Sequence, residues 1–179
     1  GSVVRGIVLV TLVGGGAYFA QNPAAVQNMA FQVADWGLKN EIYGVSLPIF
    51  EYYDSPSDAQ TPFRVAVLYE EGKGTDANKK EAFAWYQKSA KRGNAAAALK
   101  LAQMLERGEG ADANVDLAVE WYREAAEKGL AEAQYRLGIA YLREDALNLS
   151  PNPSESVKWL RQAAMQGHKQ ARELLRLTR

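Results

Sequence analysis

From about residue 60 onward, apolar and polar positions alternate with the spacing of amphipathic helices. The stretch "NAAAALKLAQMLERGEG", residues 94–110, carries Ala and Leu at helical spacing, has no β-branched run and reaches a glycine stop at Gly108. Asn114 then stands where a side chain can cap a second helix. That helix, "VDLAVEWYREAAEKG", ends at Gly129. It places one group of apolar residues on a single face: Leu117, Ala118, Trp121, Ala125 and Ala126. The pattern therefore predicts a pair of helices joined by a tight turn.

The same pattern occurs three times. Residues 72–94 and 108–130 are identical at 10 of 23 positions, and the shared residues are mostly small or aromatic while the charges differ. Trp85 and Trp121 are 36 residues apart, and Trp159 follows after 38, so the third unit carries a two-residue insertion. One helix pair cannot bury its own apolar face. We therefore expect the units to stack into a solenoid, with the Trp-Tyr pairs in its core.

Several of these stretches resemble Sel1-like repeats, relatives of the tetratricopeptide repeat: "YEEGKG", "LERGEG", "AFAWYQKSAKRGN", "AVEWYREAAEKGL" and "AEAQYRLGIAYLRE". The resemblance covers roughly residues 59–171. It implies an all-α, right-handed solenoid of antiparallel helix pairs that binds other proteins as an adaptor and has no chemistry of its own. The third unit departs from the pattern, because Glu144, Asp145 and Ala146 replace its Gly-x-Gly, so we expect a longer loop there.

This reading divides the chain into three parts. Residues 1–21 form a hydrophobic anchor helix, and residues 22–58 form a connector or N-terminal cap. Residues 59–179 form the repeat domain, with repeats at about 59–94, 95–130 and 131–168 and a C-terminal capping helix end.

Residues 6–20, "GIVLVTLVGGGAYFA", are apolar and uncharged. A membrane-spanning helix needs about 20 residues, and the uncharged flanks can extend these fifteen. We interpret the segment as a single-pass membrane anchor. A signal-peptide core and a helix buried against protein are the alternatives. As an anchor, with Arg5 on the cytoplasmic side, it would put the repeats in a bacterial periplasm, on the inner membrane.

The connector is predicted to hold an amphipathic helix that starts at Pro23 and ends at Gly37. Pro48 and Pro56 are expected to break the aromatic stretch that follows. Ile49, Phe50, Tyr52 and Tyr53 either cap the apolar end of the first repeat or form a surface for a partner. In the second case Phe50, Tyr52 and Tyr53 are the secondary candidate surface.

Composition argues against several functions. The formal net charge is zero, which gives no overall field for nucleic acid, and there is no cysteine for thiol or Cys-type zinc chemistry. The single histidine, His168, has no acid or nucleophile partner nearby in sequence, and "GKGTD" lacks the spacing of a phosphate loop. We therefore expect no enzyme activity, cofactor, metal or small-molecule substrate.

One group of residues is the candidate binding site. Residues at equivalent places on the first helices of the repeats would line a basic, partly apolar groove: Arg64, Lys100, Gln103, Met104, Arg107, Arg136 and Arg143. The alternative is an ordinary solvated face. We expect the groove to bind a protein partner, in particular an acidic segment, so that the chain acts as a membrane-tethered adaptor in an envelope complex. The other functional hypothesis is an immunity-type protein that neutralises a toxin by binding it.

Overall fold

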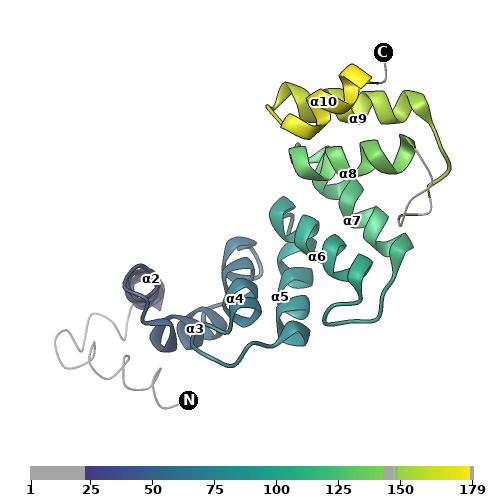
Figure 1. Cartoon of the computed structure of the whole chain (residues 1–179). Coiled ribbons are helices and arrows are strands. Elements are labelled where there is room, and N and C mark those ends of the chain that lie inside the picture. The colour runs from purple at the N-terminus through teal and green to yellow at the C-terminus, as the bar shows by residue number, and fades with distance from the viewer. Residues whose placement is uncertain (1–22, 143–146, 148, 178–179) are drawn as a thin grey trace. The chain divides into compact units, whose positions relative to one another are not determined.

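The computed structural model describes residues 23–142, 147 and 149–177. Throughout this part of the chain the regular secondary structure is helical (Figure 1). The helices are α2 (Pro23–Lys39), α3 (Tyr43–Tyr52), α4 (Gln60–Glu71), α5 (Lys79–Lys91), α6 (Ala95–Arg107), α7 (Val115–Glu127), α8 (Ala131–Leu142), α9 (Pro153–Met165) and α10 (Lys169–Leu177). The predicted all-α class is confirmed. Residues 6–20 lie outside the described residues, so the anchor stays a prediction.

The chain divides into two compact units, Gly1–Trp85 and Tyr86–Arg179, and the division falls inside α5. The first unit contains α2, α3, α4 and the start of α5. The second contains the rest of α5 and α6 to α10. Each unit has its own packed interior, and the two are described separately below.

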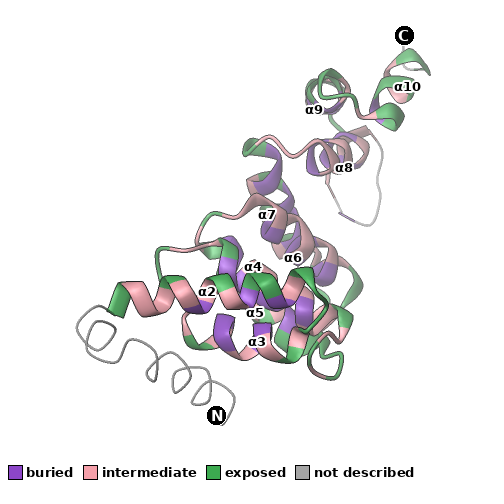
Figure 2. Ribbon diagram, turned by 90° about the vertical axis from the view of Figure 1, so that its left-hand side faces the viewer, coloured by how far each residue is buried: buried purple, intermediate pink, exposed green. Residues whose placement is uncertain are grey.

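In the first unit, α3 packs against both α2 and α4. One core joins the three helices, and it consists of Ala30, Ala34, Leu47, Ile49, Phe50, Val65 and Leu68 (Figure 2). Burying a side chain such as Phe50 contributes roughly 1.5–3 kcal/mol to folding. Residues before the repeats therefore share a core with the first helix of the first repeat.

Helices α2 and α3 form a helical hairpin, and two predictions about it were wrong because tertiary packing overrides the local sequence. Helix α2 does not end at Gly37, as the sequence predicted, but continues to Lys39. A side-chain carbon at Gly37 would lie 2.5 Å from the Ser46 hydroxyl oxygen, so the glycine allows α2 and α3 to approach closely. Pro48 does not break the chain either, because α3 runs through it. The proline removes one backbone hydrogen bond, and the buried neighbours Ile49 and Phe50 hold the helix in place.

In the second unit, α6 packs on α7, α8 on both α7 and α9, and α10 on α9. Its interior includes fully buried Tyr122, Leu137 and Leu160. At Gly138 an added carbon would lie 2.6 Å from the Leu160 side chain, and the Ser156 hydroxyl donates to the Gly138 carbonyl at 2.7 Å. Small residues therefore set the α8–α9 spacing.

Side chains cap several helices, and the cap predicted at Asn114 is confirmed. Asn114 accepts a hydrogen bond from the Leu117 N–H at 3.0 Å, and Asn152 accepts one from the Glu155 N–H at 3.2 Å. Gly108 closes α6 with φ of 68°, which confirms the glycine stop. The longer loop predicted for the third repeat includes residues 143–146 and 148, which lie outside the described residues, so it stays a prediction.

Within the Trp-Tyr pairs, the tyrosine side chain is more buried than the tryptophan side chain. Trp121 was expected to be a core residue, but it is only half-buried, whereas its neighbour Tyr122 is completely buried. Tyr86, at the same position of the first repeat, is also completely buried. The tyrosine is therefore the main core side chain of these two pairs.

Candidate functional site

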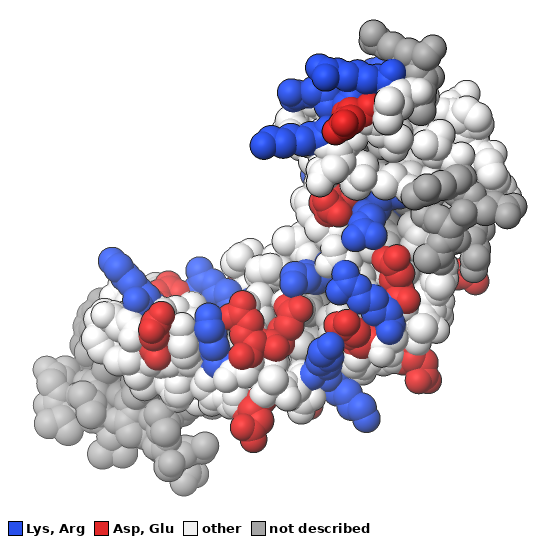
Figure 3. All heavy atoms as spheres, viewed as in Figure 1, with Lys and Arg blue, Asp and Glu red and all other residues white. Residues whose placement is uncertain are grey.

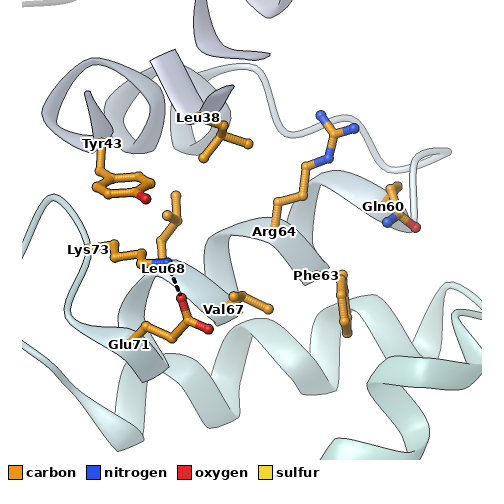
Figure 4. A pocket seen from close by; sticks show the side chains of 9 residues that line it. All are labelled: Leu38, Tyr43, Gln60, Phe63, Arg64, Val67, Leu68, Glu71 and Lys73. Atoms are coloured by element: carbon orange, nitrogen blue, oxygen red, sulfur yellow. Dashed lines mark ion pairs between the residues drawn. The ribbon is translucent and has the colours of Figure 1, made fainter. Parts of the chain in front are cut away.

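The first unit contains a pocket of about 320 Å³ on the exposed side of α4 (Figure 4). Side chains three, four and seven residues apart share one face of a helix, and this spacing brings Phe63, Arg64 and Val67 to the pocket. Leu38 and Tyr43, from the α2–α3 hairpin, lie opposite them. The complete lining is Leu38, Tyr43, Gln60, Phe63, Arg64, Val67, Leu68, Glu71 and Lys73.

Two ion pairs lie at this pocket. Arg64 contacts Asp35 at 2.5 Å, and its guanidinium carbon is 5.5 Å from the centre of the Phe50 ring. Lys73 contacts Glu71 at 2.8 Å, and its ammonium lies 5.1 Å from the centre of the Tyr43 ring. The hydrogen bond to Glu71 raises the pKa of Lys73 above its usual value. All four charged side chains are roughly half-exposed, and ion pairs this accessible to water contribute little to stability.

The glycine motif of the repeat places Lys73 in this arrangement. Gly74 has φ of 80°, and a side-chain carbon there would lie 2.7 Å from the carbonyl carbon and oxygen of Tyr43. Only glycine lets the loop come this close to α3. The glycines of "GKG" therefore hold Lys73 beside Tyr43.

The second unit carries most of the other predicted groove residues, and acidic side chains lie among them. Lys100 and Gln103 are half-exposed on α6, and Arg107 is exposed at its end. Met104 is only 4% exposed, so its prediction as a groove residue was wrong: it lies on the core side of α6, one position beyond Gln103. Arg143 lies outside the described residues, and Arg64 belongs to the first unit.

The cations of the second unit have acidic neighbours. Arg136 binds Glu132 at 3.2 Å and lies within electrostatic reach of Glu106, while Arg107 is 4.0 Å from Glu109. On the face shown in Figure 3, Lys and Arg side chains are interspersed with Asp and Glu side chains. Adjacent carboxylates therefore offset the positive charge expected of a basic groove.

A hydrogen-bonded tyrosine on α7 joins this helix to the last turn of α6. The Tyr122 hydroxyl donates to a Glu106 carboxylate oxygen at 2.6 Å. Burial, the hydrogen bond and the Glu106 charge together raise the pKa of Tyr122 above its usual value. The third repeat has neither residue: one period after Glu106 stands Leu142, and 38 residues after Tyr122 stands Leu160.

His168 has partners that its sequence neighbours did not reveal. Its Nδ1 accepts a hydrogen bond from the Ala171 N–H at 3.3 Å and so caps α10, and its Nε2 lies 3.0 Å from Glu132. A neutral ring with its proton on Nε2 satisfies both contacts. Burial alone would raise the pKa of Glu132, but hydrogen bonds from His168 and Arg136 outweigh it and lower that pKa. His168 therefore fastens α10 to α8.

The three residues of the secondary candidate surface, Phe50, Tyr52 and Tyr53, do not share one exposed face, because α3 directs Phe50 and Tyr52 to different sides. Phe50 is completely buried, so its prediction as part of an exposed surface was wrong. Tyr53 is half-buried, with its ring centre 6.1 Å from that of Phe31. Tyr52 is 69% exposed because it points to the opposite side of the helix.

The sequence prediction missed most of the pocket. Val67 and Phe63 could have been found, because Val67 stands one repeat before Gln103 and Phe63 precedes it by one helical turn. Leu38 and Tyr43 had no such signal, since only the packing of the hairpin brings them to α4.

In the described part of the chain, no group of three His, Asp or Glu side chains could hold a metal ion. No helix of that same part combines the length and apolar character needed to cross a membrane.

Comparison with known proteins identifies the repeats. The sequence model of the Sel1 repeat matches residues 63–94, 95–130 and 131–168. No curated protein sequence matches the chain.

Solved structures share the fold. A Sel1 repeat protein from Oxalobacter formigenes is 30% identical with a TM-score of 0.68, over 79% of this chain and 56% of that one. The protein c5321, a protective antigen present in uropathogenic Escherichia coli strains with an SLR fold, is 22% identical with a TM-score of 0.72, over 81% of this chain and 32% of that one. MamA is 16% identical with a TM-score of 0.53, over 87% of this chain and 85% of that one. The chain thus spans about half and about a third of the length of the first two.

Proposed function

The chain belongs to the Sel1 repeat family, and from this membership we propose that it is a non-enzymatic adaptor that holds a segment of a partner protein against its first helices. Sel1 repeats are generally protein-interaction scaffolds without catalytic activity. The observation that carries the proposal is that α4 in the first unit and α6 in the second each leave a row of side chains accessible. The row on α4 includes Arg64 and Val67, and the separate row on α6 includes Lys100, Gln103 and Arg107.

Affinity capture from native membranes, followed by mass spectrometry, tests this proposal. Arg107→Glu changes an exposed side chain on a first helix, so folding should be nearly unaffected while partner recovery falls. Arg161→Glu is the matched control, because it makes the same change on the exposed side of a second helix. Equal recovery with wild type and both variants would argue against the first-helix face of the second unit. Recovery of a toxin as the main partner would favour the immunity-type alternative.

The adaptor is further proposed to be tethered to the bacterial inner membrane, with its repeats in the periplasm as part of an envelope complex. The support is the uncharged apolar run at residues 6–20 with Arg5 before it. Expression with and without residues 6–20 should move the protein from the membrane pellet to the soluble fraction. An unchanged distribution would reject the tether and leave the adaptor proposal standing.

A further inference from the structure

The pocket on α4 combines an apolar interior with charged edges. Its apolar lining comes from three helices: Leu38 from α2, Tyr43 from α3, and Phe63, Val67 and Leu68 from α4. Binding pockets for small ligands begin at about 300 Å³, so this one has room for a single large side chain and its adjoining backbone. A central apolar anchor surrounded by polar groups is the arrangement found at the strongest contacts of protein interfaces.

The charges at the edge of the pocket are already matched. Asp35 holds Arg64, and Glu71 holds Lys73, so two cations face two carboxylates. The edge as a whole therefore carries no net charge, so a carboxylate from a partner would gain no net attraction there while losing part of its hydration. An uncharged anchor leaves both pairs intact and removes only apolar surface from water.

The pocket is also preformed by contacts that do not depend on a ligand. The close approach of Gly74 to the Tyr43 backbone holds the loop that carries Lys73. Arg64 lies against the ring of Phe50, which is completely buried. Binding therefore requires little ordering of the protein, which lowers the entropic cost.

We propose that this pocket binds one large uncharged apolar side chain, such as leucine, methionine or phenylalanine, from a segment of the partner protein, and that it disfavours a carboxylate. This inference rests on the proposed adaptor function. It departs from the sequence-based expectation of an acidic partner segment. That expectation treated Arg64 as an available cation, whereas Asp35 already pairs with it.

Methyl-detected NMR of the full chain tests the inference with two matched probes, N-acetyl-leucinamide and N-acetyl-glutamic acid amide. The leucine probe should shift the methyl signals of Leu38, Val67 and Leu68 and bind at least about tenfold more tightly than the glutamate probe, since 1.4 kcal/mol corresponds to that factor. Val67→Trp should fill the pocket and abolish these shifts. Gln103→Trp, one repeat later, is the matched control and should leave them unchanged.

A second variant tests the role of the paired charges without filling the pocket. Glu71→Gln frees Lys73, so it should strengthen binding of the glutamate probe several-fold and leave the leucine probe nearly unaffected. Circular dichroism establishes that each variant is folded. Equal binding of the two probes to wild type, or leucine binding that survives Val67→Trp, would overturn the inference.

The remaining outcomes separate this inference from the adaptor function. Absence of leucine-probe shifts overturns the pocket assignment even if partner capture succeeds. A chain that binds the leucine probe but captures no partner counts against the adaptor function alone. Methyl shifts that depend on protein concentration without any probe would assign the pocket to a second copy of the chain and overturn the inference.

Discussion

The hydrogen bond between Tyr122 and Glu106 allows a direct test of how the second repeat is held together. The tyrosine side chain is completely buried, and its hydroxyl lies 2.6 Å from the carboxylate. Tyr122→Phe keeps the ring and removes only the hydroxyl. The carboxylate then loses a charge-assisted hydrogen bond, for which we expect a cost of about 1.5–3 kcal/mol.

A change at Glu106 instead leaves the Tyr122 hydroxyl unpaired. Glu106→Leu keeps an apolar stem on α6 and leaves the buried hydroxyl without its acceptor, at a cost of about 1–3 kcal/mol. The double variant has neither polar group to leave unpaired. We therefore expect it to cost at least about 1 kcal/mol less than the sum of the single changes.

Urea unfolding of the four proteins, followed by far-UV circular dichroism and by tryptophan fluorescence, measures this coupling. The two probes must give coincident transitions, because repeat arrays can unfold in parts. Costs that add to within about 0.5 kcal/mol would refute the reasoning and show that water replaces the lost partner.

Three further predictions concern packing, capping and ionisation. Gly138→Ala should destabilise the chain by about 1–3 kcal/mol in urea unfolding, because the new carbon overlaps the Leu160 side chain; a stabilised variant would disprove the overlap. His168→Ala should lower the hydrogen-exchange protection of α10 by about 0.5–2 kcal/mol, whereas His168→Asn should preserve more of it, and equal losses would exclude a capping role. Burial and the hydrogen bond to Glu51 raise the pKa of Tyr69 from 10.0 to about 12, so the stabilising contribution of Tyr69 is complete below pH 10 and is lost as pH rises through about 12. In an ultraviolet titration, Tyr69→Phe should reduce the absorbance change from the tyrosines that ionise at the highest pH. A titration curve that the substitution leaves unchanged at high pH would contradict the raised pKa of Tyr69.

Features that depend on local sequence were predicted well. The cap at Asn114 and the stop at Gly108 follow from residues within one turn of the helix end, so the local sequence alone is enough to predict them. The repeat period supplied the all-α class, because equivalent residues in successive units must perform the same packing. Neither inference needs knowledge of a distant neighbour.

Features that depend on distant neighbours were missed or misread. Gly37 and Pro48 look like helix breakers in isolation, and only contacts between α2, α3 and α4 make them compatible with continuous helices. Arg64 was counted as an available cation because Asp35 lies 29 residues away. For Arg136 the signal was present, since Glu132 stands four residues before it on the same helix.

The replacement of the tyrosine–glutamate pair by two leucines in the third repeat affects how such chains can be recombined. A first helix with Glu106 suits a second helix with Tyr122, whereas the third repeat has Leu142 and Leu160 at those places. Exchanging one helix alone would set a buried hydroxyl against an aliphatic side chain, or a carboxylate against leucine. The unit that can be duplicated, deleted or grafted is therefore the whole helix pair, and a crossover inside the loop between its helices would produce a mismatched core.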